Sequence, residues 1–490
     1  MIILARAIVA LVVVVAAAVT AAAERPNVLF IVSDDLNTAL SGMGHPECRT
    51  PNLDKFAKTG VTFTRAFCQF PLCGPSRASI MTGQYPLANG VTSNGGEVAQ
   101  ERVTLPVHFA NHGYSTARVS KIYHMGIPVD IVEGTPGRDH APSWRETHNI
   151  TALEALTPGK AEDFQNPETV KQFPEERQKW LAAQKGGKPY RFTQVARAQY
   201  ASIEVEEKNQ HLLADTMAAN KAIEILRTRA ARDEPFFLAV GLVRPHFPFI
   251  ATDTLMDQYD ADELFVPNVP SNDLEDIPAV AHGSILRFEK SPIQKMRRAY
   301  YGAVSFMDSQ VGRILAELDS LQIRDNTIVV FVSDHGYLLG EHHMWKKAKL
   351  WEEAIRVPLI ISAPGMTQGV LCNHFVELVD LYPTITNLAG LPPDPSAQGQ
   401  SLVTLLDDPN TSLEKADALI QVRDGFGLRS GRWAWMWYPK SKKNKRDSFM
   451  LYDLNNDPHQ YTNLADLSEY AAVRKRLHRR LLTRIAAAKK

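Results

Sequence analysis

The sequence of 490 residues contains only four cysteines, and this scarcity excludes a disulfide-stabilised protein. The four cysteines are too few to hold an exported protein of this size together through disulfides. None of them has Cys-x-x-Cys spacing, which argues against structural zinc and thioredoxin-like chemistry. A bridge between Cys48 and Cys68 is the pairing to consider; Cys73 and Cys372 are the other two.

The sequence also lacks an excess of positive or negative charge, because 54 Lys and Arg residues balance 54 Asp and Glu residues. No global field therefore attracts nucleic acid or an anionic membrane, and any recognition of an anion has to be local. No internal repeat or low-complexity segment is present. The basic run at residues 440–446 is more typical of a solvated hairpin loop than of a binding patch.

Beyond the N-terminus, no apolar run is long enough to span a bilayer. The N-terminus itself has one early cation, an apolar run over residues 8–19 and then three alanines that end at Ala23. This pattern predicts a secretory signal peptide over residues 1–23, with an uncleaved anchor as the alternative. We expect a periplasmic or secreted protein without stable membrane insertion after cleavage.

Apolar runs of strand length alternate with helical patterns along most of the chain. Strands are expected at residues 27–33, 114–119, 235–241, 327–333 and 357–363. One buried helical face follows from apolar side chains spaced three and four apart, namely Tyr300, Val304, Met307, Val311, Leu315 and Leu318. The pattern predicts an α/β fold in which helices sandwich a large, mostly parallel sheet.

Two regions depart from this alternation. Residues 130–197 lack periodicity and are rich in Pro, Gly and charge, which favours long insertions over the functional face. A proline-rich stretch after Gly390 marks a boundary, so we expect a main domain at residues 24–390 and a smaller α+β subdomain at residues 391–490. The subdomain should contain strands near residues 418–422, 432–438 and 449–453 and a closing helix at residues 470–488.

Cys73 precedes a predicted short helix. Pro75 suits the first helical position and Gly83 suits the end of the helix. Backbone N–H groups and the helix dipole would lower the pKa of the Cys73 thiol and attract an anion, and Arg77 adds a cation one turn along. The alternative is a half-buried structural cysteine.

Two predicted strands end alike, in Ser-Asp-Asp at Asp34 and Asp35 and in Ser-Asp-His at Asp334 and His335. Ligands bind outside the carboxyl ends of strands in open α/β sheets, so both pairs would face one crevice. Each pair alone would also fit an Asp that caps a turn. Together with Cys73 they indicate a site for a hard divalent ion, Ca²⁺ or else Mg²⁺, rather than zinc.

Further polar residues follow two other predicted strands. Lys121 and His124 follow residues 114–119, and His246 stands between two prolines after residues 235–241. A surface lysine and packed histidines are the alternative interpretation of these positions.

The phrase from Cys73 to Arg77, followed by Thr82 and Gly83, resembles the Cys-x-Pro-Ser-Arg signature of the type I sulfatases of the alkaline phosphatase superfamily. In that family a formylglycine-generating enzyme oxidises the Cys to formylglycine, whose hydrated aldehyde attacks the sulfur of a sulfate ester beside Ca²⁺. The resemblance implies that residues 24–390 are a catalytic sulfatase domain. Gln84 stands where the family usually has Arg.

Three more phrases carry the resemblance. Ser120 to His124 resembles Gly-Lys-x-x-His, whose Lys and His contact the hydrated aldehyde and the sulfate. Arg244 to Phe249 resembles a phrase of iduronate sulfatases whose His lies near the leaving oxygen, here His246. Gly340 to Lys347 resembles a stretch whose final Lys contacts sulfate, so that role falls to Lys347 rather than to Lys346. The sequence most resembles the iduronate-2-sulfatases. The resemblance covers nearly all of the chain after the predicted signal peptide, up to about Leu464.

The first hypothesis is therefore an exported sulfatase acting on a sulfated carbohydrate, with 2-O-sulfate on a uronic acid or related sugar as the expected substrate. Arg77, Lys121 and Lys347 would bind sulfate, His246 or Lys347 would protonate the leaving alcohol, and His124 would help to release sulfate. Two alternatives remain open: a phosphomonoester, phosphodiester or phosphonate hydrolase of the same superfold, and a non-catalytic sulfoglycan-binding protein.

Overall fold

The computed structural model describes residues 25–188, 190, 200–232, 234–442 and 444–490. The predicted signal peptide at residues 1–23 lies outside the described residues, as does most of the stretch after residue 190 that ends the predicted insertion. Among the described residues, no helix combines the length and apolarity needed to cross a membrane.

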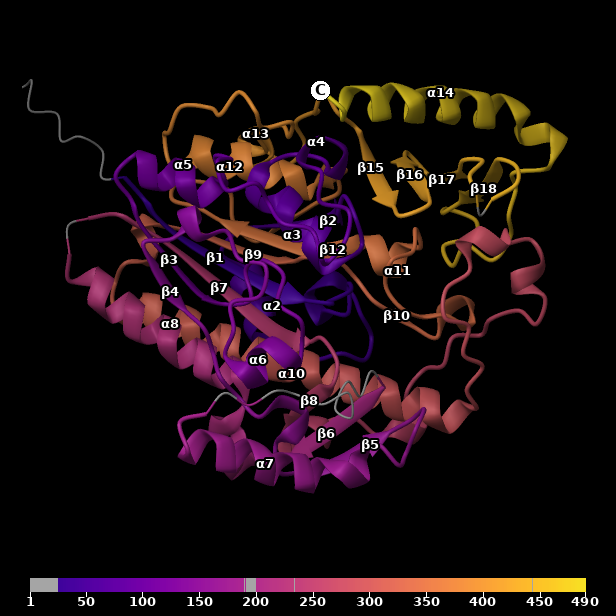
Figure 1. Ribbon diagram of the computed structural model, residues 1–490. Helices are drawn as coiled ribbons and strands as arrows, with labels where there is room; N and C mark the ends of the chain where they lie inside the picture. Colours follow the sequence, from indigo (N-terminus) through magenta and orange to yellow (C-terminus); the bar gives the residue numbers. More distant parts are fainter. Residues whose placement is uncertain (1–24, 189, 191–199, 233, 443) are drawn as a thin grey trace, which may run out of the picture.

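A nine-stranded sheet forms the centre of the molecule (Figure 1). Strand β1 (Asn27–Asp34), buried from Val28 onward, pairs in parallel with β7 (Phe236–Pro245) on one side and with β9 (Thr327–Ser333) on the other. Beyond β7 lie β3 (Ser115–Ser120) and β4 (Glu146–His148), also parallel. The continuous apolar runs of β1, β7 and β9 reflect burial on both faces of the sheet.

The other edge of the sheet mixes strand directions. Strand β12 (Arg356–Ser362) is antiparallel to both β9 and β2 (Val61–Phe67), while β13 (Val370–Cys372) and β14 (Val376–Glu377) are parallel to β2. The predicted mostly parallel sheet is confirmed. An apolar run reports burial and not direction, so the sequence did not show that β12 is reversed.

Helices cover both faces of this sheet (Figure 1). One face packs against α8 (Ala214–Ala230) and α10 (Lys290–Ser320), and all six apolar positions predicted for one helical face are buried on α10. The opposite face packs against α3 (Cys73–Thr82), α5 (Leu105–Asn111) and α12 (Leu381–Leu388). The predicted sandwich of helices is therefore confirmed.

The cysteine bridge considered from the sequence does not form. Cys48 packs in the core on the α8 and α10 side of the sheet, whereas Cys68 packs in the core on the α3 side. All four cysteines are free and buried. The sheet itself separates the Cys48 and Cys68 thiols.

Residues 130–197 are more regular than their composition predicts. They include β5 (Lys160–Asp163) and α7 (Phe173–Lys185), a helix whose only buried residues are Phe173 and Glu176, which explains its weak periodicity. Strand β5 pairs with β6 (Ala201–Val205), and β6 pairs with β8 (Phe249–Thr252). Because β8 follows β7 directly, this small sheet lies at the carboxyl end of β7, as Figure 1 shows.

The C-terminal part is a smaller α+β subdomain, as expected. Its four-stranded antiparallel sheet has the order β15 (Asp417–Val422), β16 (Gly425–Ser430), β17 (Trp433–Tyr438) and β18 (Ser448–Asp453). One face of this sheet joins the core of the main domain, and the other packs under α14 (Ala471–Ala487) (Figure 1). The boundary near Gly390 remains a prediction.

A buried ion cluster attaches α14 to the main domain. Arg484 donates to Glu377 Oε2 at 2.7 Å and to the hydroxyl of Tyr85 at 2.6 Å, and Lys415 Nζ lies 2.8 Å from the same carboxylate oxygen. Burial raises the pKa of Glu377, but the charges of Arg484 and Lys415 outweigh it and lower that pKa to about 2. The C-terminal helix is thus tied to Tyr85 and Glu377 of the main domain through one charged cluster.

Candidate active site

The pairing of β1 with β9 sets the geometry of the site. The two strands run parallel with Ser33 opposite Ser333, so the residues that follow them emerge side by side. Asp334 Oδ1 accepts the backbone N–H of Asp35 at 3.2 Å and that of His335 at 2.9 Å. The side chains of Asp34, Asp35, Asp334 and His335 are completely buried.

Cys73 faces this group from α3. The helix begins at Cys73 itself, two residues earlier than Pro75 indicated, and Ser76 Oγ donates to the carbonyl of Asp334 at 2.5 Å. The Sγ atom lies 3.2 Å from Lys347 Nζ and 3.3 Å from His335 Nε2. Burial raises the pKa of the thiol, but the neighbouring cations, Lys347 first among them, outweigh it and lower that pKa below its ordinary value.

Three buried cations balance the carboxylates. Arg77 Nε donates to Asp334 Oδ2 at 2.7 Å, and its Nη2 lies 3.6 Å from Asp34 Oδ1. Lys121 forms an ion pair with Asp34. Lys347 forms an ion pair with Asp35 and is only about 10% exposed. The structure thus brings together all three residues expected to bind sulfate.

The two histidines lie at different depths. His246 is buried, with Nδ1 2.7 Å from the carbonyl of Phe247, so this nitrogen carries the proton and Nε2 faces Asp35 Oδ2 at 3.9 Å. His124 is half-buried, and its Nδ1 has no hydrogen-bond partner among the described residues. Burial and the charge of Lys121 lower the pKa of His124 to about 3, so this ring is neutral.

The sequence did not indicate the residues that support His246. The guanidinium of Arg244 donates to the carbonyl of His246 at 2.6 Å and forms a buried ion pair with Glu154. Asp215 accepts the backbone N–H of Val243 at 2.7 Å and that of Arg244 at 2.9 Å. Arg244 belongs to the segment of residues 244–249 whose sequence pattern indicates His246 as a site residue. No sequence pattern near Glu154 or Asp215 indicates that they support this histidine.

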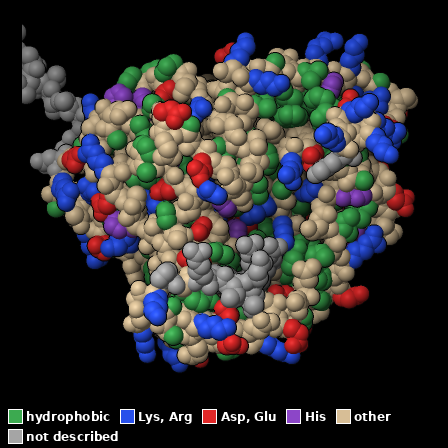
Figure 2. All heavy atoms as spheres, in the orientation of Figure 1, with side chains coloured by type: hydrophobic (Ala, Val, Ile, Leu, Met, Phe, Trp, Pro, Cys, Tyr) green, Lys and Arg blue, Asp and Glu red, His purple; other side chains and the backbone are tan. Residues whose placement is uncertain are grey.

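Aromatic rings and lysines lie beside these groups. Lys346 Nζ is 4.6 Å from the ring centre of Tyr200 and 5.9 Å from that of Phe247, and Lys347 Nζ is 5.8 Å from the Phe247 ring. Figure 2 shows histidine and lysine or arginine side chains gathered near the centre of the viewed face. Lys346, which we did not favour as a sulfate ligand, is thus adjacent to the site but directed toward Tyr200.

The donor set fits a divalent metal ion. Two overlapping groups have ligand atoms within 4.8 Å of one another: Asp34, Cys73, Asp334 and His335, and Asp34, Asp35, Cys73 and His246. Oδ1 of Asp34 and Oδ2 of Asp35 are buried without a hydrogen-bond donor among the described residues, and Oδ2 of Asp34 has only its ion pair with Lys121. Two of the four residues in each group are carboxylates, the oxygen ligands that Ca²⁺ and Mg²⁺ prefer.

Comparison with known proteins identifies the family. The profile of the Sulfatase family matches residues 26–391, which include every residue of the site. The chain belongs to the sulfatase family. A second profile, that of the N-sulphoglucosamine sulphohydrolase C-terminal region, matches residues 340–487.

Individual sulfatases match over most of the chain. A sulfatase of Formosa agariphila is 29% identical over 471 residues, covering 90% of this chain and 83% of that protein. The iduronate 2-sulfatase of Mus musculus is 29% identical over 424 residues, covering 76% of this chain and 70% of that enzyme. Both support the resemblance found from the motifs.

The fold also occurs outside the sulfatases. The crystal structure of a phosphonate monoester hydrolase of Agrobacterium radiobacter aligns with a TM-score of 0.74 at 23% identity, covering 95% of this sulfatase and 96% of that chain. This likeness supports the alkaline phosphatase-like fold of the chain.

Proposed function

We propose that this sulfatase is exported to the periplasm or secreted, and that it removes 2-O-sulfate from a uronic acid or related sugar of a sulfated polysaccharide. It uses formylglycine made from Cys73 by a formylglycine-generating enzyme, together with Ca²⁺ or else Mg²⁺. The observation that carries the proposal is the position of Cys73, whose Sγ lies among three buried carboxylates, the buried cations Arg77 and Lys121, and the mostly buried Lys347.

The charge of the site supports a role for the metal ion. Asp34, Asp35 and Asp334 offset the charges of Arg77, Lys121 and Lys347, so these six side chains sum to zero. The charges of these six groups therefore give little net attraction for an anionic sulfate ester. A divalent ion held by the carboxylates would supply the missing positive charge and withdraw electron density from the sulfate oxygens.

The chain's own residues would then act on a bound sulfate ester. Hydrated formylglycine supplies one hydroxyl as nucleophile and a second that allows sulfate to leave. Arg77, Lys121 and Lys347 orient the sulfate, and His246 or Lys347 delivers a proton to the leaving alcohol. Neutral His124 can accept a proton as sulfate is released. All of these residues precede residue 391, so we assign catalysis to residues 24–390.

The substrate assignment has two supports. The relative from Mus musculus is an iduronate 2-sulfatase by name and is similar over 76% of this chain. In addition, Lys346 lies next to the sulfate-binding Lys347, where its ammonium group could contact the carboxylate of a uronic acid. Release of sulfate from oligosaccharides that carry a single 2-O-sulfate, compared with 6-O-sulfated controls, tests this specificity.

A second candidate function is hydrolysis of phosphonate or phosphate esters. The TM-score of 0.74 with a phosphonate monoester hydrolase favours it, because a protein of that name has the same fold. Rates on an aryl sulfate, an aryl phosphonate and an aryl phosphate, measured side by side, distinguish the two. A higher kcat/KM on either phosphorus ester would replace the sulfatase assignment.

The decisive experiment is the mass of the peptide that contains Cys73. Conversion of the thiol to an aldehyde lowers this mass by about 18 Da, and a carbonyl-reactive probe should label the product. Protein made together with a formylglycine-generating enzyme should show the change, and Cys73→Ala should have almost no turnover. Full activity with an unmodified thiol would refute the mechanism, and a binding protein without turnover would support the non-catalytic alternative.

A further inference from the structure

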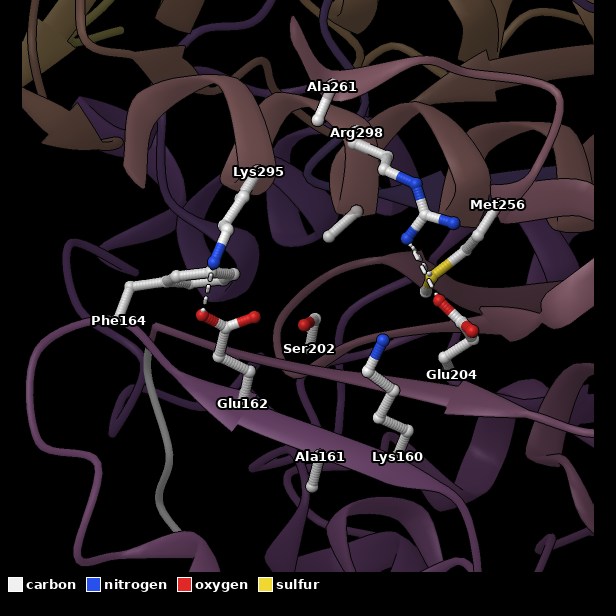
Figure 3. Close-up of a pocket in the computed structure, with 11 residues that line it drawn as sticks. Lys160, Ala161, Glu162, Phe164, Ser202, Glu204, Met256, Ala261, Lys295 and Arg298 are labelled. Carbon is white, nitrogen blue, oxygen red and sulfur yellow. Dashed lines mark hydrogen bonds and ion pairs between the residues drawn. The ribbon is translucent and has the colours of Figure 1, made fainter. Parts of the chain in front are cut away.

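A second polar cavity lies between the small sheet and α10. It has a volume of about 500 Å³ and is bounded by β5, β6 and the first turns of α10 (Figure 3). None of the sulfate-binding or metal-binding residues proposed above lines it. A volume of this size is in the range of small-molecule binding sites.

The floor of the cavity is one face of the β5 and β6 pair. Lys160 lies opposite Glu204, and Glu162 lies opposite Ser202 in the antiparallel register. Alternate residues of a strand point to the same side, and Figure 3 shows these four side chains directed toward α10. A sheet face turned toward a helix is ordinarily apolar and closely packed, but this face is polar and leaves a gap.

The roof is equally polar. Lys295 of α10 lies 3.1 Å from Glu162, and both side chains are about half exposed, at 48% and 47%. Arg298, one turn further along α10, lies 2.9 Å from Glu204. Lys160 has no ion pair among those formed by the described residues. Arg298 also lies 2.8 Å from Asp257, which is not part of the cavity lining, so within the lining itself three cations meet two carboxylates. The half-exposed pair of Lys295 with Glu162 is held only weakly.

We propose that this cavity binds a sulfated sugar unit of the polysaccharide, at a distance from the sulfate that is cleaved. Sulfate or carboxylate groups of the sugar would contact Lys160, Lys295 and Arg298 in place of the weak internal pairs. Glu162 and Glu204, once released, would accept hydrogen bonds from sugar hydroxyls, and the Phe164 ring at the edge of the cavity offers an apolar surface for sugar C–H groups. The inference rests on the polysaccharide substrate of the proposed function.

The cavity is connected to the active site by direct contacts. The backbone N–H of Phe164 donates to the carbonyl of Tyr200 at 3.1 Å. The ring of Tyr200 in turn contacts the ammonium group of Lys346, which precedes Lys347 in the chain. A polymer long enough to reach both sites would bind more tightly than a single sugar, because its second contact is intramolecular.

The test compares a small substrate with a polymeric one. In the double variant Lys160→Ala/Lys295→Ala, we expect KM for a sulfated uronic-acid hexasaccharide such as a heparin fragment to rise about tenfold, since each exposed charge contact contributes a factor of about 3. Both kinetic constants on an aryl sulfate should stay unchanged. Lys290→Ala, which removes an exposed cation from the same helix outside the cavity, is the matched control and should change neither.

The outcomes separate this inference from the proposed function. Absence of turnover on the aryl sulfate by the unsubstituted enzyme would refute the sulfatase function itself. Normal turnover on the aryl sulfate with an unchanged hexasaccharide KM in the double variant would refute the cavity alone. An equal rise of KM in the Lys290→Ala control would show a general effect of surface charge and would also overturn the inference. A charge reversal, Lys295→Glu, should raise the hexasaccharide KM further than Lys295→Ala.

Discussion

Substitution of Asp334 by Asn tests the site with little change of side-chain size. In the native site Asp334 Oδ2 accepts from Arg77 Nε, and Oδ1 accepts from the backbone N–H groups of Asp35 and His335. An amide has only one acceptor oxygen, so its NH₂ group must face an N–H donor on one side or the other. The variant also removes one of the three buried carboxylates of the proposed metal site.

The expected losses are large because both partners of the ion pair are buried. The side chains of Arg77 and Asp334 are 1% and 0% exposed, so solvent screens their attraction very little. Removing one partner of such a pair costs about 3–5 kcal/mol of unfolding free energy. We expect bound Ca²⁺ to fall to background in elemental analysis, and kcat/KM on an aryl sulfate to fall at least about 100-fold.

Asp308→Asn is the matched control. Asp308 is 1% exposed, and its two oxygens accept the backbone N–H groups of Leu53 at 2.7 Å and Asn52 at 3.1 Å. This control should lower the free energy of urea unfolding but keep native metal content and native kcat/KM. If Asp334→Asn also kept its metal and its turnover, neither metal ligation nor catalysis would depend on this carboxylate, and the proposed site would be wrong.

Three further predictions use other parts of the structure. Lys347→Met removes the ammonium group nearest to Cys73 Sγ, so kcat/KM on an aryl sulfate should fall at least about 100-fold; near-native turnover would contradict its role. The unfolding temperature should fall as well, because the buried carboxylate of Asp35 loses its partner. Thiol titration of the denatured protein should find three free thiols if Cys73 is converted, since none of the four cysteines forms a disulfide, and four if it is not. The pKa of Glu377 is about 2 in the folded protein against an ordinary 4.5, so its stabilising contribution is complete above pH 4.5 and disappears as the pH falls toward 2. Urea unfolding across this range should lose stability faster for the native protein than for Glu377→Gln, and parallel curves would refute the assignment.

The buried part of the fold could be predicted because its signals are local. Strands β1, β7 and β9 are continuous apolar runs, and α10 repeats apolar side chains every three or four residues. Strand direction could not be predicted in this way. The reversal of β12 depends on the length and path of the chain that connects it to β9. Helix α7 was missed for a related reason, because it presents mostly charged side chains to solvent.

From the sequence, the site residues could be predicted where they stand at the ends of predicted strands. Asp34 and Asp334 are 300 positions apart, yet both follow a buried strand, and the parallel pairing of these strands brings them together. Glu154 and Asp215 follow no comparable rule. Each contacts Arg244 from a distant segment, so only the folded chain shows that they position His246.

The complete burial of Cys73 limits when the residue can be modified. In the finished protein its side chain has no exposed surface, so a modifying enzyme cannot reach it. The groups that enclose it come late in synthesis: His335 follows it by 262 residues and Lys347 by 274. At about 5–20 residues per second, the ribosome needs about 15–55 s to make that length of chain. During this interval His335 and Lys347 are not yet present to enclose the cysteine, so the proposed oxidation to an aldehyde would have to precede the completion of β9 and the segment that follows it.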